Sequence, residues 1–600
     1  QELRYSVFDR DDKARSAMVL DKTGRDVAKI LAAVPGLSGN MSYEEEQTGT
    51  LTNLRIVISA SELAMIPFEA SKVPSGDGSV AAWLALQARS PICITRHIRS
   101  VSAEGIVWPD RPRILFISGP DTDRPFEEHK RVLLNVIEPW CKDESVIGDQ
   151  LVILKNPGLS SVANELDSAA RAKKEFTHVH ILAHGARTDE DDRYSPVGLY
   201  LNDIEGEGVV GGGRLASTLA VTTDEGVKRP LVVTLASCDS GKISDVRTAD
   251  ASVAHHLHDQ GIPLVVASQF PLSVEGSVLF TEMFYRGQLS GEHPLISLYK
   301  VRMELHSRME PDTHDWASLV AYEAFPSNLA NQLEELRYWQ ARRAQYLALD
   351  RLEGLAVKIR DKTSSLDRAN IEAGFENAVK DVEKASDNLP TKGPYALDCA
   401  GLRAAANKRI GLVDFRVAKA AGVPDGWRER RLSYCLSRMQ AARDQYWTAA
   451  KWFIQPSEET VQRKGNLHWM LGQVLSLDVV LGRELDVSLQ MSAYFAANVD
   501  LNSPDEIDRA WAHVSLSELA LLKLSDSKLS ANQRKQFSEE SLTNATRFLE
   551  LLGGGSEQAF NTSRQFRRYV NWWGNPDLQP ELDELRIPER PHWQLKHGLV

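Results

Sequence analysis

Two reactive side chains each follow an apolar run, and a pair of this kind can perform nucleophilic catalysis. His184 comes directly after the apolar run 177–183. Cys238 follows a second apolar run, 231–236, after one intervening residue. A cysteine nucleophile needs a proton acceptor and donor nearby, an exposed position, and N–H groups directed at the developing oxyanion. The chemistry therefore depends on whether the two runs are neighbouring strands.

The surrounding elements are typical of a mostly parallel sheet flanked by helices. Between residues 54 and 325, short apolar runs alternate with helical patterns. The expected strands are 54–59, 92–98, 114–118, 151–154, 177–183, 231–236 and 264–268, and the expected helices are 80–87, 127–137, 162–174, 252–260 and 274–288. Several strands are continuous apolar runs, as expected when both faces of a sheet are covered. Sites in such α/β folds form at the carboxyl ends of the strands.

Parallel pairing of the two apolar runs would place His184 and Cys238 side by side. Cys238 follows His184 by 54 residues, close to the spacing of roughly 50 in the caspase pattern, where the histidine also comes first. Gly185 would let the backbone approach a substrate closely. We expect the N–H groups of Gly185 and Cys238 to form the oxyanion hole. A lone buried cysteine or histidine would favour a structural role, whereas both motifs at this spacing favour catalysis.

The order of the motifs resembles the CHAT domain, a branch of the caspase- and separase-type cysteine peptidases (clan CD) that often occurs with tetratricopeptide repeats. The matching segments are 54–70 with Pro67-Phe68-Glu69-Ala70, His184-Gly185, 197–201, 236–241, 261–273 and 315–320, the last as the closing strand. The resemblance covers residues 50–326. It implies an endopeptidase with His184 as general acid and base and Cys238 as nucleophile, acting through a thioester acyl-enzyme.

The residues beside Cys238 leave the substrate preference open. In metacaspases, which resemble this site, an acidic residue two positions before the cysteine helps bind a basic P1 side chain, and caspases have a glutamine there. Ala236 matches neither pattern. Asp239 is a candidate charge at the pocket, although a solvated loop aspartate explains it equally well. We name Ala236 and Asp239 as possible substrate-pocket residues and assign no P1 preference.

Residues 327–600 are expected to be helical. Helix formers with a 3.6-residue period dominate there, as in 329–348 and 469–481. Trp469 and Trp511 each open a similar segment, and they lie 42 residues apart, against the 34-residue period of tetratricopeptide repeats. Irregular repeats and a plain helical bundle both fit this pattern. We predict three parts: an N-terminal segment 1–50 of the peptidase region, a caspase-like domain 51–326, and a helical region 327–600 that regulates the site or binds a partner.

Composition excludes several classes of protein. The 600 residues carry a net charge of −12, which disfavours general binding to nucleic acids. Five scattered cysteines form neither a disulfide framework nor a CxxC metal pair. No apolar run reaches the ~18 residues of a membrane span, and the first residues lack the pattern of a signal peptide. We therefore expect a cytoplasmic location, and the start at Gln1 rather than Met suggests a fragment or a processed product.

Known motifs exclude further activities. The sequence contains no GxxxxGK[ST], GxSxG or HExxH, which argues against Walker-type ATPases, α/β-hydrolases and common zinc peptidases. Residues 206–211 satisfy GxGxxG, but Glu207 would repel a phosphate, so we expect a flexible loop. We predict no cofactor and no metal.

These observations predict a cysteine endopeptidase that cleaves protein substrates and is controlled by its helical region or by a protein regulator. The resemblance also implies a context of regulated proteolysis, including bacterial stress and antiviral defence. Two alternatives remain open at this point: a catalytically silent caspase-fold scaffold for protein assembly, and a cysteine acyltransferase or deamidase. The oligomeric state is not predicted.

Overall fold

The structure is a computed structural model that describes most of the chain. The described residues are 13–37, 51–58, 61–73, 82–109, 112–140, 147–187, 197–203, 206–236, 249–270, 272–308, 314–361, 365–420, 423–454, 467–526, 528–553, 562, 565–567 and 569. They divide into two compact units, Gln1–Gln340 and Ala341–Val600. Each unit has its own hydrophobic cores.

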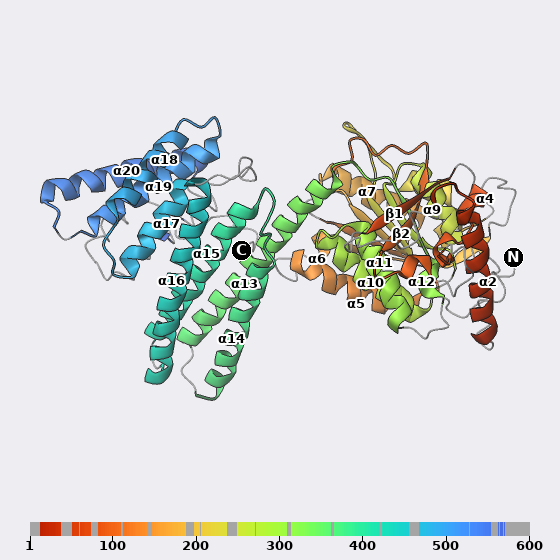
Figure 1. Cartoon of the computed structure of the whole chain (residues 1–600), viewed down its shortest axis with the longest axis horizontal. Coiled ribbons are helices and arrows are strands. Elements are labelled where there is room, and N and C mark those ends of the chain that lie inside the picture. The colour runs from red at the N-terminus through yellow and green to blue at the C-terminus, as the bar shows by residue number, and fades with distance from the viewer. Residues whose placement is uncertain are drawn as a thin grey trace. The chain divides into compact units, whose positions relative to one another are not determined.

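The first unit is built on an eight-stranded sheet with the order β1-β2-β13-β12-β11-β5-β3-β4. Figure 1 shows strands of this unit with helices around them. Its strands are β1 (Thr52–Ile58), β2 (Ile92–Ile98), β3 (Ile114–Ser118), β4 (Leu151–Lys155), β5 (His178–Leu182), β11 (Val232–Ala236), β12 (Leu264–Ser268) and β13 (Leu319–Glu323). Neighbouring strands are parallel except β12 and β13, which are antiparallel. The predicted mostly parallel α/β sheet is confirmed.

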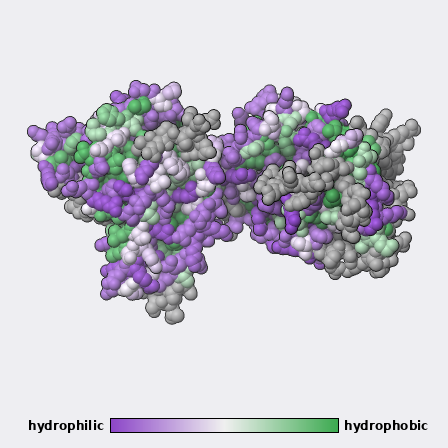
Figure 2. Space-filling model, viewed as in Figure 1, coloured by the Kyte–Doolittle hydropathy of each residue, from purple (hydrophilic) through white to green (hydrophobic). Residues whose placement is uncertain are grey.

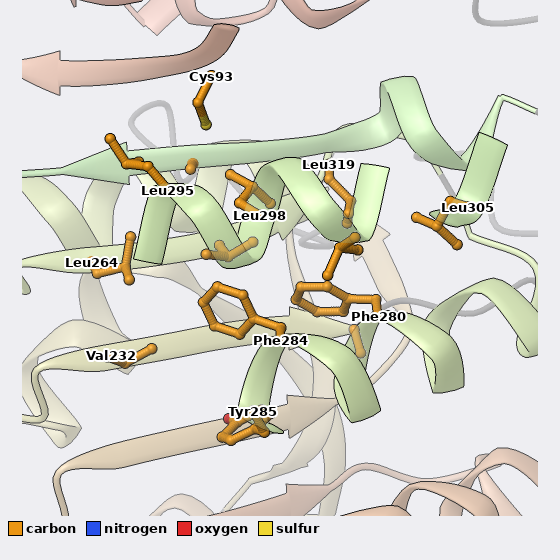
Figure 3. Packing of buried hydrophobic residues seen from close by; sticks show 14 of the residues in the cluster. Cys93, Val232, Leu264, Phe280, Phe284, Tyr285, Leu295, Leu298, Leu305 and Leu319 are labelled. Atoms are coloured by element: carbon orange, nitrogen blue, oxygen red, sulfur yellow. The ribbon is translucent and has the colours of Figure 1, made fainter. Parts of the chain in front are cut away.

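Helices cover both faces of this sheet, which is why its central strands are continuous apolar runs. One face packs against α5 (Asp123–Ile137), α10 (Val274–Leu289) and α11 (Pro294–Arg308). Figure 3 shows aromatic rings of α10 gathered with leucines of α11 beside the strands. The other face packs against α7 (Leu159–Arg171) and α9 (Ala249–Asp259). Helix α2 (Lys13–Ala32) adds apolar residues to the first core.

Three local predictions in the first unit were wrong. The helix expected at 80–87 is, in its described part, only a three-residue 3-10 helix, η2 (Leu84–Leu86). Trp83 before it is extended and forms a bridge with Lys72, and the ammonium of that lysine lies over its ring. These two contacts hold Trp83 in an extended conformation. The closing strand expected at 315–320 begins with a helical turn, α12 (Asp315–Ser318), and β13 follows it.

The loop expected at 206–211 is instead a strand, β8 (Gly206–Gly211). It pairs with β7 (Val197–Asp203), which also pairs with β6 (Gly185–Arg187), and all three strands are antiparallel. Val210 is fully buried in the core on the α9 face. Burial of this side chain and the ladder hydrogen bonds outweigh the flexibility of the glycines.

The described residues from 329 onward are mainly helical, as predicted. The helices are α13 (Leu329–Asp361), α14 (Ser365–Asp387), α15 (Ala396–Lys419), α16 (Asp425–Ile454), α17 (Leu467–Val480), α18 (Val487–Asp500), α19 (Glu506–Leu524) and α20 (Ala531–Leu552). Consecutive helices from α14 to α20 pack on one another and form two cores. Figure 2 shows a largely hydrophilic surface with smaller hydrophobic patches. None of the helices in the described residues has the length and hydropathy that crossing a bilayer requires.

A fully buried ion pair fixes one side of the sheet. Glu69, in the segment that resembles the family's Pro-Phe-Glu-Ala turn, accepts two hydrogen bonds from the guanidinium of Arg96 on β2. Both side chains have no exposed area. Arg96 also donates to the carbonyls of Ala64 and Ile66 at 3.2 and 2.9 Å. The pair therefore ties the turn at 64–69 to the sheet.

We predict that Glu69→Gln destabilises the protein by about 3–5 kcal/mol, because it leaves the buried guanidinium of Arg96 without a countercharge. The measurement is urea unfolding of the full chain. The matched control is Glu282→Gln, whose partner Arg286 is 67% exposed; we expect a loss below about 1 kcal/mol there. Equal losses for the two variants would contradict the role assigned to the buried pair.

Candidate active site

The two strands that precede the candidate catalytic residues are neighbours. β5 and β11 pair in parallel, and the register joins Val232 to His178 and Ala236 to Leu182. Each pair is offset by 54 residues, which is also the spacing between His184 and Cys238. The strand pairing that we predicted is therefore confirmed. Cys238 and Asp239 themselves lie outside the described residues.

His184 is half-buried just beyond β5, and its ring contacts a main-chain carbonyl. Its Nε2 lies 3.3 Å from the oxygen of Asp121, in the loop between β3 and α5. A carbonyl oxygen can only accept, so Nε2 carries the hydrogen in this contact. In this tautomer Nδ1 is the nitrogen that carries no hydrogen. Sequence reasoning missed Asp121, because a main-chain carbonyl can come from any residue type.

The loop that supplies this carbonyl is closely fixed. Asp121 has a φ of 58° and so lies in the left-handed region, where short polar residues are the best tolerated after glycine. The Thr122 hydroxyl donates to the carbonyl of Gly119 at 2.8 Å, and the Gly119 N–H donates to the carbonyl of Leu182 at 2.8 Å. The turn is thereby tied to the end of β5, two residues before His184.

Gly185 begins β6 and is buried. The Tyr200 N–H donates to the His184 carbonyl at 2.7 Å, and Gly185 is the next residue in the same antiparallel ladder, opposite Leu199. Opposite residues in such a ladder alternate between hydrogen-bonded and non-hydrogen-bonded pairs. This alternation directs the Gly185 N–H away from β7. Its assignment as an oxyanion donor stays a prediction.

Ala236 ends β11, and 1% of its surface is exposed. It belongs to the hydrophobic cluster on the α10 face of the sheet. Because its side chain is a methyl group, Ala236 places no charge at the end of β11. The placement of Ala236 and Asp239 in a substrate pocket stays a prediction.

A chain of buried hydrogen bonds runs beneath the two strands. The His180 Nδ1 lies 2.7 Å from the Thr234 hydroxyl of β11, which lies 2.8 Å from the Tyr285 hydroxyl of α10. The His180 Nε2 lies 2.9 Å from Nδ1 of His129 on α5, whose Nε2 lies 3.1 Å from the Ser277 hydroxyl of α10. The chain thus joins two strands to the two helices that cover them.

The direction of this chain follows from its end. Ser277 donates its single hydroxyl hydrogen to the Val274 carbonyl at 2.8 Å, so its oxygen accepts from His129. With this direction His129 accepts from His180, and His180 accepts from Thr234. Each neutral ring then donates once and accepts once along the chain, and the Thr281 hydroxyl also lies 3.1 Å from the His129 Nδ1.

Burial keeps these imidazoles neutral. It lowers the pKa of His129 and of His178 to about 3. The pKa of His180 falls well below its ordinary value through burial, with a further contribution from His129. His178 and His180 are both buried in the sheet, which suits a structural role. No group of three or more metal-ligating side chains is found in the described ranges.

Comparison with known protein families settles the family. The model of the CHAT domain matches residues 21–324, which is half of the chain. The chain belongs to the CHAT domain family. This family is related to the caspase-like peptidases. A comparison with curated proteins found no match.

We predict that acid destabilises this CHAT domain through its buried histidines. The unfolded chain protonates a histidine near pH 6.5, whereas the folded state holds His129 neutral down to about pH 3. The stability that this ring contributes is present above pH 6.5 and is lost as the pH falls from 6.5 towards 3. At pH 5 the loss is about 2 kcal/mol for this ring. Urea unfolding at pH 7 and pH 5 should show a smaller pH dependence for His129→Gln than for wild type, and equal dependence would contradict the prediction.

We also predict that Gly119→Ala destabilises the CHAT domain by about 1–3 kcal/mol. A Cβ at this position would lie 2.6 Å from the Tyr200 carbonyl oxygen, so the β3–α5 loop or β7 would have to move. The control is Gly213→Ala in α8 (Gly212–Thr218), where a Cβ has no neighbour within 4 Å. Denaturant unfolding should leave the control unchanged or slightly more stable.

Proposed function

We propose that the chain is a caspase-like cysteine endopeptidase with His184 and Cys238 as its catalytic pair. The observation that carries this proposal is the 54-residue register between β5 and β11, which equals the spacing of the two residues. Membership of the CHAT domain family supports it, because this family is related to the caspase-like peptidases. The contact of the His184 ring with the Asp121 carbonyl supports a ring held in one orientation.

The proposed reaction is acyl transfer to the cysteine. The Cys238 thiol gives its proton to the His184 ring as the sulfur attacks the scissile carbonyl carbon, and the C–N bond breaks as the ring passes this proton to the leaving amine. The same ring then takes a proton from the water that attacks the thioester, and it returns this proton to the sulfur as the C–S bond breaks and the acid leaves. The N–H groups of Gly185 and Cys238 stabilise the oxyanion in both steps.

We further propose that the helical unit controls this activity or binds a protein regulator. Its separate cores support this proposal, because a unit with a core of its own can change its contacts without unfolding the sheet. The proposal includes no cofactor.

We predict that wild-type protein generates new termini in a peptide library and in candidate protein substrates, and that Cys238→Ala generates none. His184→Ala should lower the cleavage rate by about 10²–10⁴-fold. The matched control is Cys435→Ala, because Cys435 is buried in the helical unit. Mass spectrometry of the products measures both the rate and the P1 residue. Modified substrates of unchanged length would instead indicate an acyltransferase or deamidase.

A thiol-reactive peptidyl probe covers the case in which an activator is needed. Burial raises the pKa of Cys93 to about 11 and that of Cys399 and Cys435 to about 12, so these thiols should not react in the folded protein. Labelling at Cys238 that is lost in His184→Ala would support a competent site without its activator. The proposal would be contradicted if the protein neither cleaved substrates nor was labelled at Cys238. A scaffold would be favoured if, in addition, Cys238→Ala bound a protein partner as tightly as wild type does.

A further inference from the structure

The two tryptophans that mark the repeat-like segments wall the same cavity in the helical unit. Trp469 on α17 and Trp511 on α19 line a cavity of about 160 Å³. The Trp469 ring stands edge-on to Tyr446 of α16, with centroids 5.5 Å apart. A Cβ on Gly401 of α15 would lie 2.8 Å from this ring, so the absence of a side chain at Gly401 leaves room for the indole. Five helices (α13, α15, α16, α17 and α19), together with Thr562 and Gln565, thus line one aromatic-walled space.

Three charged side chains on the wall of this cavity are buried: Lys408, Arg409 and Glu518. Lys408 on α15 is 7% exposed, and Glu518 on α19 is 2% exposed. Two glutamines connect them: Gln473 and Gln565 each direct the side-chain oxygen at the Lys408 ammonium and the side-chain nitrogen at the Glu518 carboxylate. The amide orientations are therefore set by the charges on either side.

These buried charges are costly for a purely structural role. Taking an ammonium and a carboxylate out of water costs several kcal/mol each, which a direct pair with ideal geometry partly offsets. In the described residues, the hydrogen-bond partners of Glu518 are the two glutamines and the hydroxyl of Tyr569, which are all neutral. By contrast, Arg409 on the same wall bonds two carboxylates directly, Asp350 and Glu353, at 3.0 Å each.

A second observation points to a ligand. Thr562 also lines the cavity and is 4% exposed, and its hydroxyl has no hydrogen-bond partner in the described part of the chain. Buried hydroxyls normally have a partner. The Thr562 hydroxyl can therefore donate a hydrogen bond to a ligand in the cavity and accept one from it.

We propose that this cavity binds a free α-amino acid with an apolar or aromatic side chain. The ligand's carboxylate would face Lys408, its ammonium would face Glu518, and its side chain would lie between Trp469 and Trp511. The two ends of a zwitterion match the opposite charges of Lys408 and Glu518, whereas a ligand with one charge can match only one of them. The volume of about 160 Å³ suits the side chain of this class, because a cavity of about 150 Å³ holds one benzene ring, whereas drug-sized ligands use pockets of roughly 300–1,000 Å³.

The test compares phenylalanine with two analogues that each lack one charge. Binding to the full chain is measured by calorimetry and by tryptophan fluorescence for L-phenylalanine, L-leucine, 3-phenylpropionate and phenethylamine. We expect each single-charge analogue to bind about 10- to 100-fold more weakly than phenylalanine. Equal binding of either analogue, or no binding of the amino acids up to their solubility, would overturn the proposal.

Variants assign each charge to its partner. In Glu518→Gln, phenylalanine should bind no better than 3-phenylpropionate, and in Lys408→Met no better than phenethylamine. Trp511→Leu should weaken every ligand by a similar factor, and the control Trp339→Leu, outside the cavity, should leave affinity unchanged. If a charge variant does not fold, Thr562→Val replaces it, and unchanged phenylalanine affinity in that variant would overturn the placement of the ligand.

Discussion

The register of β5 against β11 is the constraint on which the candidate site depends. Side chains alternate between the faces of a strand, so a slip of one residue would send the residues after the two strands to opposite faces of the sheet. The buried hydrogen-bond chain opposes such a slip, because His180 on β5 and Thr234 on β11 are paired in the register and bonded to each other. Tyr285 and His129 extend the same bonds into the covering helices. The apolar residues around them supply the burial energy, and the polar chain selects one alignment.

The two units bury charge in different ways. In the first unit Glu69 and Arg96 meet directly, and backbone carbonyls occupy further donors of the guanidinium, so the charges serve to lock a turn. In the second unit glutamines separate Lys408 from Glu518, beside a cavity. In a direct pair, each ion largely cancels the electrostatic potential of the other. Neutral amide bridges cancel it less completely, so Lys408 and Glu518 can still attract the charged groups of a bound molecule. This contrast is why a structural role suits the first pair and a binding role suits the second.

Strands that consist of a continuous apolar run could be predicted from the sequence. Strands such as β3 and β12 are continuous apolar runs, and their bounds were predicted to the residue. The 206–211 segment was misjudged because its six residues contain three glycines, and only burial of Val210 shows why it is a strand. The Asp121 carbonyl and the shared cavity of Trp469 and Trp511 depend on tertiary contacts between distant segments. No local pattern carries that information.

The contact between His184 and a carbonyl also fits the chemistry of a thiol better than that of a hydroxyl. A serine nucleophile has to lose a proton that it holds tightly, so its histidine is commonly assisted by a buried carboxylate, which stabilises the imidazolium. A thiol ionises much more readily, and a positioned neutral imidazole is enough to share its proton. The Asp121 carbonyl orients the ring and fixes the tautomer without adding a full negative charge. In the proposed mechanism this ring gives a proton to the leaving amine, which is the harder half of amide cleavage by a cysteine.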